Sequence, residues 1–291
     1  MPKESTVSNH YESHSNESYD DAYFYEPGAY MENLANLVVD RLHLKGQQRC
    51  ILDIGGGTGT FAQTMVEKDD SGSKIVVVEP FLDPSFEDAA TTSTTDDPVS
   101  FVRASAEDFL VPATPENWRT EIIDKQHGGY DQIMMKEVVH HFKEEDRVGI
   151  FRGMKEGLRK TGNRKITPSL LIITRPQIDI DYPLWDQALD VWKKNQPSAE
   201  EIEADLQEAG FTQFERFVEP IECSITLSRW QSMVKSRCWS TFSNFTDEEL
   251  EEACAIIAEN ARNNPKNTSG KTEQDDVVLR FEDRLIFLEA S

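Results

Sequence analysis

The feature that most constrains this chain is a short apolar segment that ends in an acid and enters a glycine-rich turn, Cys50-Ile-Leu-Asp-Ile-Gly-Gly-Gly-Thr-Gly-Thr60. Glycine has no Cβ, so the backbone can turn sharply there and approach a ligand closely. A strand followed by such a turn and a helix places a ligand at the carboxyl end of a parallel sheet. The segment therefore predicts an open α/β fold with a ligand site after this strand.

The spacing of the glycines bears on which ligand is bound. A dinucleotide fingerprint has the form G-x-G-x-x-G/A and receives a pyrophosphate at the helix N-terminus. Counted from Gly55, the third small residue would be Thr60; counted from Gly57, it is Ala62, so spacing alone leaves this ligand open. The fuller pattern is D-x-G-x-G-x-G, and its acid, Asp53, would repel a pyrophosphate. The pattern favours a cationic group, such as an amino group beside a sulfonium.

Four further apolar segments follow, each ending in residues that could face a ligand. Lys74 to Val78 ends at Glu79, an acid that can accept hydrogen bonds from both ribose hydroxyls of an adenosine. A dinucleotide site would use the same acid, so Glu79 indicates an adenosine without fixing the cofactor. The other three expected strands cover residues 99–103, 130–135 and 169–174.

Taken in order, these motifs resemble the class I S-adenosylmethionine-dependent methyltransferases. They read I-L-D-I-G-G-G-T-G, V-V-V-E-P, A-S-A-E-D-F, Y-D-Q-I-M-M-K-E-V-V-H-H-F and L-L-I-I-T-R-P. Each is common alone, but the ordered series is specific, and the resemblance covers about residues 28–210. It implies S-adenosylmethionine as the cofactor. The cofactor-binding residues that it implies are Asp53, Gly55, Gly56, Gly57, Glu79, Pro80, Ser105, Ala106, Glu107 and Lys136.

The resemblance also implies a role for most of these residues. Asp53 and the glycines would hold the methionine end, and Glu79 the ribose. Ser105 and Ala106 would lie beside the adenine, and Lys136 would begin the segment that faces the methyl group. The family often has Asp where Ser105 stands, and a serine accepts a hydrogen bond from the adenine amine more weakly than a carboxylate does.

The C-terminal part completes the expected fold. Alternating residues predict strands over 211–218, 221–227 and 277–288, the last one antiparallel and lying between the fifth and sixth strands. Helices are expected over 199–209, 228–236 and 246–260. The expected fold is α/β, a Rossmann-like seven-stranded, mostly parallel sheet with an antiparallel last strand and a helical lid inserted at about 228–274. Residues 1–18 are expected to form a disordered arm, and residues 19–291 the methyltransferase domain.

The lid and the segments near it are rich in aromatic residues and arginine. An arginine suits a carboxylate because its guanidinium offers two parallel donors. Arg175, at the end of the fifth strand, is the stronger candidate, and its alternative is a surface arginine paired with an acid. For any single tryptophan, packing is the simpler interpretation. The candidate acceptor-binding residues are Tyr25, Tyr30, Arg175, Trp185, Trp230 and Arg237, with Trp230 and Arg237 expected on one helix face.

Two adjacent histidines, His140 and His141, are the candidate catalytic residues. Either could remove a proton from a substrate hydroxyl or amine, and the alternative is a histidine that packs or caps a helix start. Their spacing to Glu137 and Glu144 allows a metal ion. Two consecutive histidines rarely both face one ion, and a third ligand is not evident, so no metal is expected.

The acceptor remains open at this point. The expected reaction is methyl transfer to a small, carboxylate-bearing metabolite, with a thioether as one possibility. The chain loosely resembles algal methyltransferases that act on a methylthio-hydroxy acid, on the route to dimethylsulfoniopropionate. A sulfonium product would be stabilised by aromatic faces and would need no base. The alternatives are an O- or N-methyltransferase that uses His140 or His141, and a non-catalytic S-adenosylmethionine-binding or scaffold protein.

Composition limits the partners. The chain has 291 residues, 38% of them hydrophobic, and a formal net charge of −23, which argues against nucleic acid and anionic membranes because phosphates require basic surface. The four cysteines are scattered without a C-x-x-C pair, which favours a reducing compartment. The start of the chain also lacks the pattern of a secretory signal, so the sequence predicts a cytoplasmic protein. We expect it to be a monomer or homodimer whose partner is a small-molecule acceptor.

Overall fold

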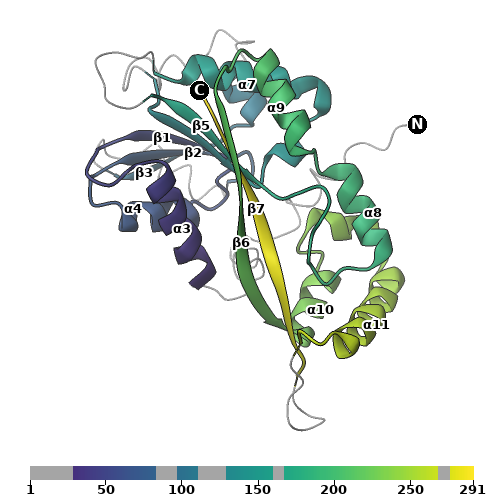
Figure 1. Cartoon of the computed structure of the whole chain (residues 1–291). Helices are drawn as coiled ribbons and strands as arrows, with labels where there is room; N and C mark the ends of the chain where they lie inside the picture. Colours follow the sequence, from purple (N-terminus) through teal and green to yellow (C-terminus); the bar gives the residue numbers. More distant parts are fainter. Residues whose placement is uncertain (1–28, 83–96, 111–128, 160–166, 268–275) are drawn as a thin grey trace. The chain divides into compact units, whose positions relative to one another are not determined.

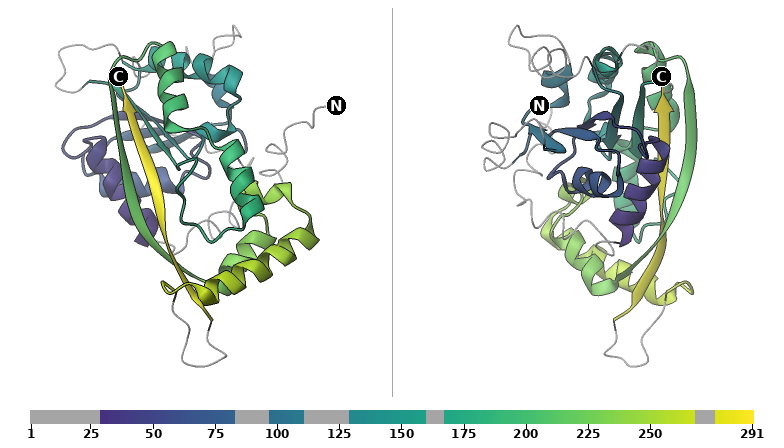
Figure 2. Two further views of the ribbon diagram at one scale, coloured as in Figure 1. Left: turned by 45° about the vertical axis from the view of Figure 1, so that its right-hand side comes forward. Right: turned by 90° about the vertical axis from the view of Figure 1, so that its left-hand side faces the viewer.

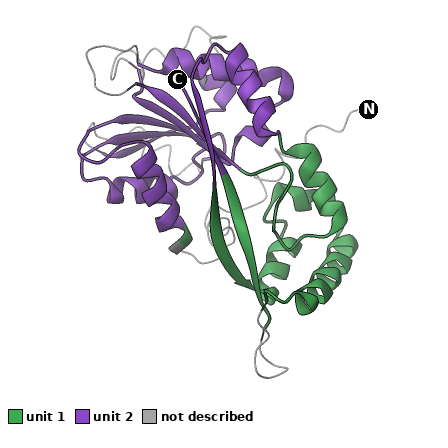
Figure 3. Cartoon of the chain, viewed as in Figure 1, with its two compact units in different colours: residues 1–30, 175–197, 219–285 green, residues 31–174, 198–218, 286–291 purple. Residues whose placement is uncertain are grey.

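The structure is a computed structural model that describes residues 29–82, 97–110, 129–159, 167–267 and 276–291 (Figure 1). The expected arm over residues 1–18 and the candidate Tyr25 lie outside these residues. The chain divides into two compact units (Figure 3). Unit 2 comprises residues 31–174, 198–218 and 286–291, and unit 1 comprises residues 1–30, 175–197 and 219–285.

A seven-stranded sheet has the order β3-β2-β1-β4-β5-β7-β6. Its first five strands pair in parallel, and β7 pairs antiparallel with β5. This confirms the predicted fold class, including the position of the last strand between the fifth and sixth. The strands are β1 (Cys50–Ile54), β2 (Lys74–Val78), β3 (Val99–Val102), β4 (Gln132–Lys136), β5 (Ser169–Thr174), β6 (Phe214–Thr226) and β7 (Val278–Ala290).

The central strands are mostly apolar because both faces of a parallel sheet are covered. Every residue of β1 and of β5 is buried. In unit 2, α3 and α4 lie on one face of the sheet, and α7 and α9 lie on the other (Figures 1 and 2). The helices of this unit are α3 (Ala29–Arg41, from Met31 onward), α4 (Thr60–Lys68), α6 (Ala106–Leu110), α7 (Glu144–Gly157) and α9 (Ala199–Glu208).

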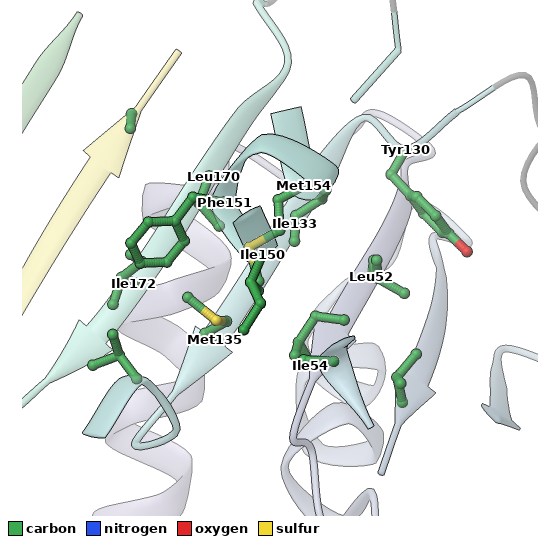
Figure 4. Close-up of a cluster of buried hydrophobic side chains, with 14 of the residues drawn as sticks. Leu52, Ile54, Tyr130, Ile133, Met135, Ile150, Phe151, Met154, Leu170 and Ile172 are labelled. Carbon is green, nitrogen blue, oxygen red and sulfur yellow. The ribbon is translucent and has the colours of Figure 1, made fainter. Parts of the chain in front are cut away.

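A cluster of buried side chains joins α7 to three parallel strands. Ile150, Phe151 and Met154 of α7 point toward the sheet, where they meet residues of β1, β4 and β5 (Figure 4). Two of these strands carry charged residues of the candidate site near their carboxyl ends, Asp53 on β1 and Lys136 on β4. Burial of the apolar side chains therefore fixes the strands from which the site is built.

The C-terminal elements differ from the sequence prediction at one point. Residues 211–218 and 221–227 were expected as two strands, but β6 runs unbroken from Phe214 to Thr226. Pro220 lies within it and donates no ladder hydrogen bond. A proline is tolerated there because β6 lies at the edge of the sheet, where one row of N–H groups has no neighbouring strand.

Unit 1 contains the helices expected between β6 and β7. They are shifted by one to three residues from the predicted bounds, and α11 opens with a capping box between Thr246 and Glu249. None of the described helices has the length and apolar character to span a membrane. The elements of this unit are α8 (Asp186–Asn195), α10 (Leu227–Lys235), the 3₁₀ helix η3 (Ser240–Asn244) and α11 (Asp247–Asn263).

Candidate active site

The glycine turn packs directly over the carboxylate of Asp53, near the end of β1. Asp53 is only 2% exposed. A Cβ added to Gly56 would lie 2.5 Å from Oδ2 of Asp53 and 2.9 Å from Cγ1 of Val77. Neither distance is compatible with a side chain, so only glycine lets the turn come this close. The buried acid and the glycine are therefore parts of one local structure.

The next glycine faces space instead of protein. Gly57 has φ +57°, and a Cβ built on it would meet no atom of the described residues within 4 Å. Its N–H donates to Oε2 of Glu79 at 3.1 Å. The other oxygen, Oε1, accepts from the N–H of Phe81 at 3.1 Å. Each carboxylate oxygen keeps further lone pairs, so Glu79 can still accept from a ligand placed over Gly57.

The two acids of the site are both less acidic than usual. Burial raises the pKa of Asp53 to about 7, the positive charge of Lys136 opposes this shift, and Glu79 adds to it. Burial also raises the pKa of Glu79, against the two backbone donors that lower it. A cationic ligand would favour the charged form of both acids. The two carboxylates thus fit a ligand with a positive charge near the turn and hydroxyls near Glu79.

The segment after β3 supplies the third expected contact region. Oγ of Ser105 accepts from the N–H of Asp108 at 3.0 Å, at the start of α6. Ala106 is buried and Glu107 half-buried. Pro80 is half-buried, and its carbonyl accepts from Nε of Arg103 at 3.4 Å. The hydroxyl of Ser105 is therefore engaged with its own helix, and its role toward an adenine stays a prediction.

A strained residue directly follows β4. Glu137 has φ +60°, a left-handed conformation that costs about 1–2 kcal/mol for a residue with a Cβ. Its N–H donates to the carbonyl of Ile173 at 2.8 Å, which fixes it against β5. Such strain concentrates at functional sites. The sequence gives no signal for this conformation, because neither Lys136 nor Val138 is typical of a turn.

The histidines lie in a short 3₁₀ helix, η2 (Val139–His141), which precedes α7. Their ring centroids are 3.9 Å apart. Burial lowers the pKa of His140 to about 4, so its imidazole is neutral at pH 7. Nδ1 of His140 is inaccessible and has no hydrogen-bond partner among the described residues. Within the described ranges, no group of three or more His, Cys, Asp and Glu residues could hold a metal ion.

Arg175, expected to anchor an acceptor, is instead 4% exposed and bound to Asp283, which is fully buried. Its Nη2 lies 3.0 Å from Oδ2 of Asp283. The hydroxyl of Tyr30 donates to the same oxygen at 2.5 Å, and the hydroxyl of Tyr182 donates to Oδ1. Burial alone would raise the pKa of Asp283, but Arg175 and the two hydroxyls outweigh it, so the pKa is lowered.

Sequence reasoning did not single out Asp283 or Tyr182. A signal for the acid was present, since Leu279, Phe281, Asp283 and Leu285 alternate along β7 and all point inward. An acid at an inward position of an alternating strand requires a buried partner. The alternative for Arg175, a surface arginine paired with an acid, is confirmed in the pairing with Asp283 and wrong in the exposure, because the guanidinium is buried.

The prediction that Arg237 shares a helix face with Trp230 is also wrong. The helix α10 ends at Lys235, and Arg237 adopts φ +55° beyond the cap residue Ser236. Its Nη2 donates to the carbonyl of Phe245 at 2.9 Å and pairs with Asp247 at 2.7 Å. This left-handed residue ends the helical path and turns the side chain toward the start of α11.

The tryptophan candidates lie in the interior of unit 1. Trp230 is fully buried, and its Nε1 donates to the carbonyl of Pro183 at 2.9 Å. Trp185 stacks on Phe242 with ring centroids 5.9 Å apart. These side chains, with Tyr30 and Arg175, belong to unit 1, whereas Asp53, Glu79 and the histidines belong to unit 2.

A family model described as a methyltransferase domain matches residues 28–215, and the chain belongs to this family. Together with the motifs, sheet order and turn geometry, this match defines a class I S-adenosylmethionine-dependent methyltransferase. S-adenosylmethionine is accordingly its cofactor, as the resemblance implied. No curated protein matches the chain in sequence.

Among solved structures, the cyclopropane synthase MmaA2 from Mycobacterium tuberculosis is similar in fold. It has a TM-score of 0.54 and 16% identity, and the match covers 98% of this chain and 97% of that one. Phosphoethanolamine N-methyltransferase 2 from Haemonchus contortus, in complex with S-adenosyl-L-methionine, has a TM-score of 0.48 and 15% identity over 89% of this chain and 52% of that one. The mycolic acid cyclopropane synthase CmaA1 has a TM-score of 0.49 and 14% identity, over 89% and 88% of the two chains.

We predict that Gly57→Ala affects both protein stability, through backbone strain, and cofactor affinity, through contact with the ligand. Gly46 is a matched control, because it also has a positive φ (+73°) and no neighbour among the described residues within 4 Å of an added Cβ. Both alanine variants should lose about 1 kcal/mol of unfolding free energy in urea. Only Gly57→Ala should also lose affinity for S-adenosylmethionine, by about tenfold or more in calorimetry. Equal affinities for the two variants would contradict the placement of the ligand over Gly57.

We predict that Arg175→Ala destabilises the protein by about 3–5 kcal/mol, because it leaves Asp283 buried without its ion pair. Arg216→Ala is the control. Its ion pair with Glu200 is 2.6 Å long, but the two side chains are 37% and 72% exposed. Removal of an exposed pair should cost at most about 1 kcal/mol. Urea unfolding followed by circular dichroism measures both, and similar losses would show that the buried pair has no special weight.

Proposed function

We propose that unit 2 holds S-adenosylmethionine at the turn between β1 and α4, and that the protein methylates a small-molecule acceptor. The observation that carries this proposal is the pairing of two acids with one glycine turn. Asp53 lies under Gly56, and Glu79 receives the N–H of Gly57. When bound, the cofactor supplies an electrophilic methyl group on a sulfonium.

Different residues around the turn would bind different parts of the cofactor. Asp53 would face the cationic methionine end, and Glu79 would accept hydrogen bonds from the ribose hydroxyls. Ser105 and Ala106 would border the adenine. Lys136 would contact the same region from β4, where its Nζ already lies 5.2 Å from the ring centroid of Phe61. The protein would contribute to the rate chiefly by holding the acceptor in line with the methyl carbon.

The basicity of His140 bears on which acceptor atom is methylated. A neutral imidazole can accept a proton from a hydroxyl or amine, but a pKa of about 4 makes it a weak base. A thioether acceptor needs no base at all. This supports S-methylation of a carboxylate-bearing thioether, such as a methylthio-hydroxy acid, as the first acceptor to test. O- or N-methylation with His140 or His141 as base is the second.

The arginines give limited support for a carboxylate on the acceptor. Arg175 is engaged with Asp283, so an acceptor carboxylate would have to compete with an internal one. Arg237 pairs with Asp247, and its side chain keeps 30% exposure. Arg237 is therefore the better of the two for contact with a soluble anion, and its role remains a proposal.

A non-catalytic role is the alternative from a different class. A scaffold that had lost transfer would not need to retain a buried acid of low acidity, and here Asp53, the turn and Glu79 are all in place. All four cysteines are buried and free. This fits a protein of a reducing compartment, and we propose a cytoplasmic monomer or homodimer.

We predict that Asp53→Asn and Glu79→Gln each weaken S-adenosylmethionine binding by about 1–3 kcal/mol, the cost of losing a charged hydrogen bond. The control is Glu67→Gln, an exposed acid on α4. Calorimetry with S-adenosylmethionine measures the affinities, and the oxidised nicotinamide dinucleotide serves as the competing candidate ligand. Unchanged binding in both site variants, or tighter binding of the dinucleotide, would refute the assignment.

The acceptor can be identified with methyl-labelled S-adenosylmethionine. The wild-type protein is incubated with 4-methylthio-2-hydroxybutyrate, an amino acid amine, a hydroxy acid and a metabolite extract, and the labelled product is isolated. For a thioether, His140→Asn should retain turnover within a few-fold. For a hydroxyl or amine, it should lose about 10²–10⁴-fold if His140 is the base. Cofactor binding without any labelled product would favour the scaffold.

A further inference from the structure

Two carboxylates border the glycine turn after β1, and one of them, Asp53, is only 2% exposed. Asp53 lies between β2 and β4, opposite Val77 on one side and Met134 on the other. Gly56 closes over it from above. The carboxylate of Glu79 accepts a hydrogen bond from the N–H of Gly57, the next residue of the turn. The two acids therefore lie at the same turn and act on each other electrostatically.

The charges in this region do not balance. Within the described ranges, the charged groups that act on Asp53 are Glu79, from the end of β2, and Lys136, from the end of β4. The turn itself contributes no ionisable group, and α4 presents Phe61 beside the ammonium of Lys136. One lysine cannot neutralise two carboxylates, and burial makes an unbalanced charge costly.

We propose that the free protein keeps a proton on the Asp53–Glu79 pair near neutral pH, and that this proton is released when a cationic ligand binds at the turn. This inference rests on the proposed function, because S-adenosylmethionine is the cation in question. The step is a simple ionisation. The O–H bond of the carboxylic acid breaks, the electron pair stays on the carboxylate, and the proton passes to the buffer.

The direction of the linkage follows from the electrostatics. Burial raises the pKa of Asp53 to about 7, against 3.8 for a solvated aspartate, and raises that of Glu79 as well. For an acid whose pKa is raised by folding, the stabilising proton is fully present below the unfolded value. It is lost as the pH rises through the folded value. A positive ligand lowers the pKa again, so binding and proton release occur together between about pH 4 and pH 7.

The number of protons that the Asp53–Glu79 pair releases on binding should depend on the charge of the ligand. At pH 7 about half of the free protein carries the proton, so binding of the cation should release about half a proton. Between pH 6 and pH 8 the contribution of Asp53 should raise the affinity about tenfold. S-adenosylhomocysteine lacks the sulfonium and should release less. The pair would thus weaken the product relative to the cofactor as the pH rises.

The experiment is calorimetry of the full chain with S-adenosylmethionine and with S-adenosylhomocysteine, at pH 7, in phosphate and in Tris. The dependence of the heat on the buffer gives the number of protons released. The amino group of either ligand titrates in the same range, so each value is compared with that of Asp53→Asn. Asp69→Asn is the matched control, because Asp69, at the end of α4, is also buried, but hydrogen bonds from Ser71 and Ser73 lower its pKa.

We expect wild type and Asp69→Asn to release about half a proton more than Asp53→Asn with S-adenosylmethionine, and a smaller excess with S-adenosylhomocysteine. Equal release in wild type and Asp53→Asn would overturn the inference. Should the variant fail to fold, a carbon-13 carboxyl titration of the free wild-type protein replaces it. A midpoint near 7 for one buried aspartate supports the inference, and midpoints all below 5 overturn it. Absence of S-adenosylmethionine binding in the wild type would refute the proposed function, while the titration would still test the buried proton.

Discussion

The contact between Gly56 and the carboxylate of Asp53 is the constraint on which the candidate site depends. The turn can cross this acid only because a glycine has no side chain to collide with it. The acid in turn is held by β1, which is buried along its whole length between two parallel neighbours. The neighbouring positions of β1 could not carry this acid, because the residues on either side of Asp53 are apolar and face helices.

The parallel strands could be predicted because a strand covered on both faces of a parallel sheet is a mostly apolar segment. Cys50–Ile54 and Ser169–Thr174 are of this type, and the acids at the ends of β1 and β2 then mark the ligand edge. The capping signals of α9 and α11 were equally visible, with Ser198 and Thr246 as the residues that begin them. These features depend on neighbours that are close in sequence.

What could not be predicted depends on partners that are remote in sequence or on backbone conformation. Arg175 and Asp283 are 108 residues apart, and only the fold brings them together. Glu137 and Arg237 adopt left-handed conformations although neither is glycine or asparagine. Pro220 marks a strand end in the sequence, yet β6 continues through it because the edge of a sheet tolerates a missing donor.

The boundaries of the two units have a consequence for how such a protein can change. The chain passes from one unit to the other after Tyr30, Thr174, Pro197, Val218 and Leu285. Unit 1 is thus encoded in three separate stretches, and the last two boundaries fall inside β6 and β7. A single crossover between two related genes would leave parts of both units mismatched. Variation in unit 1 is therefore expected to accumulate by point substitution and loop change, and not by the exchange of a module.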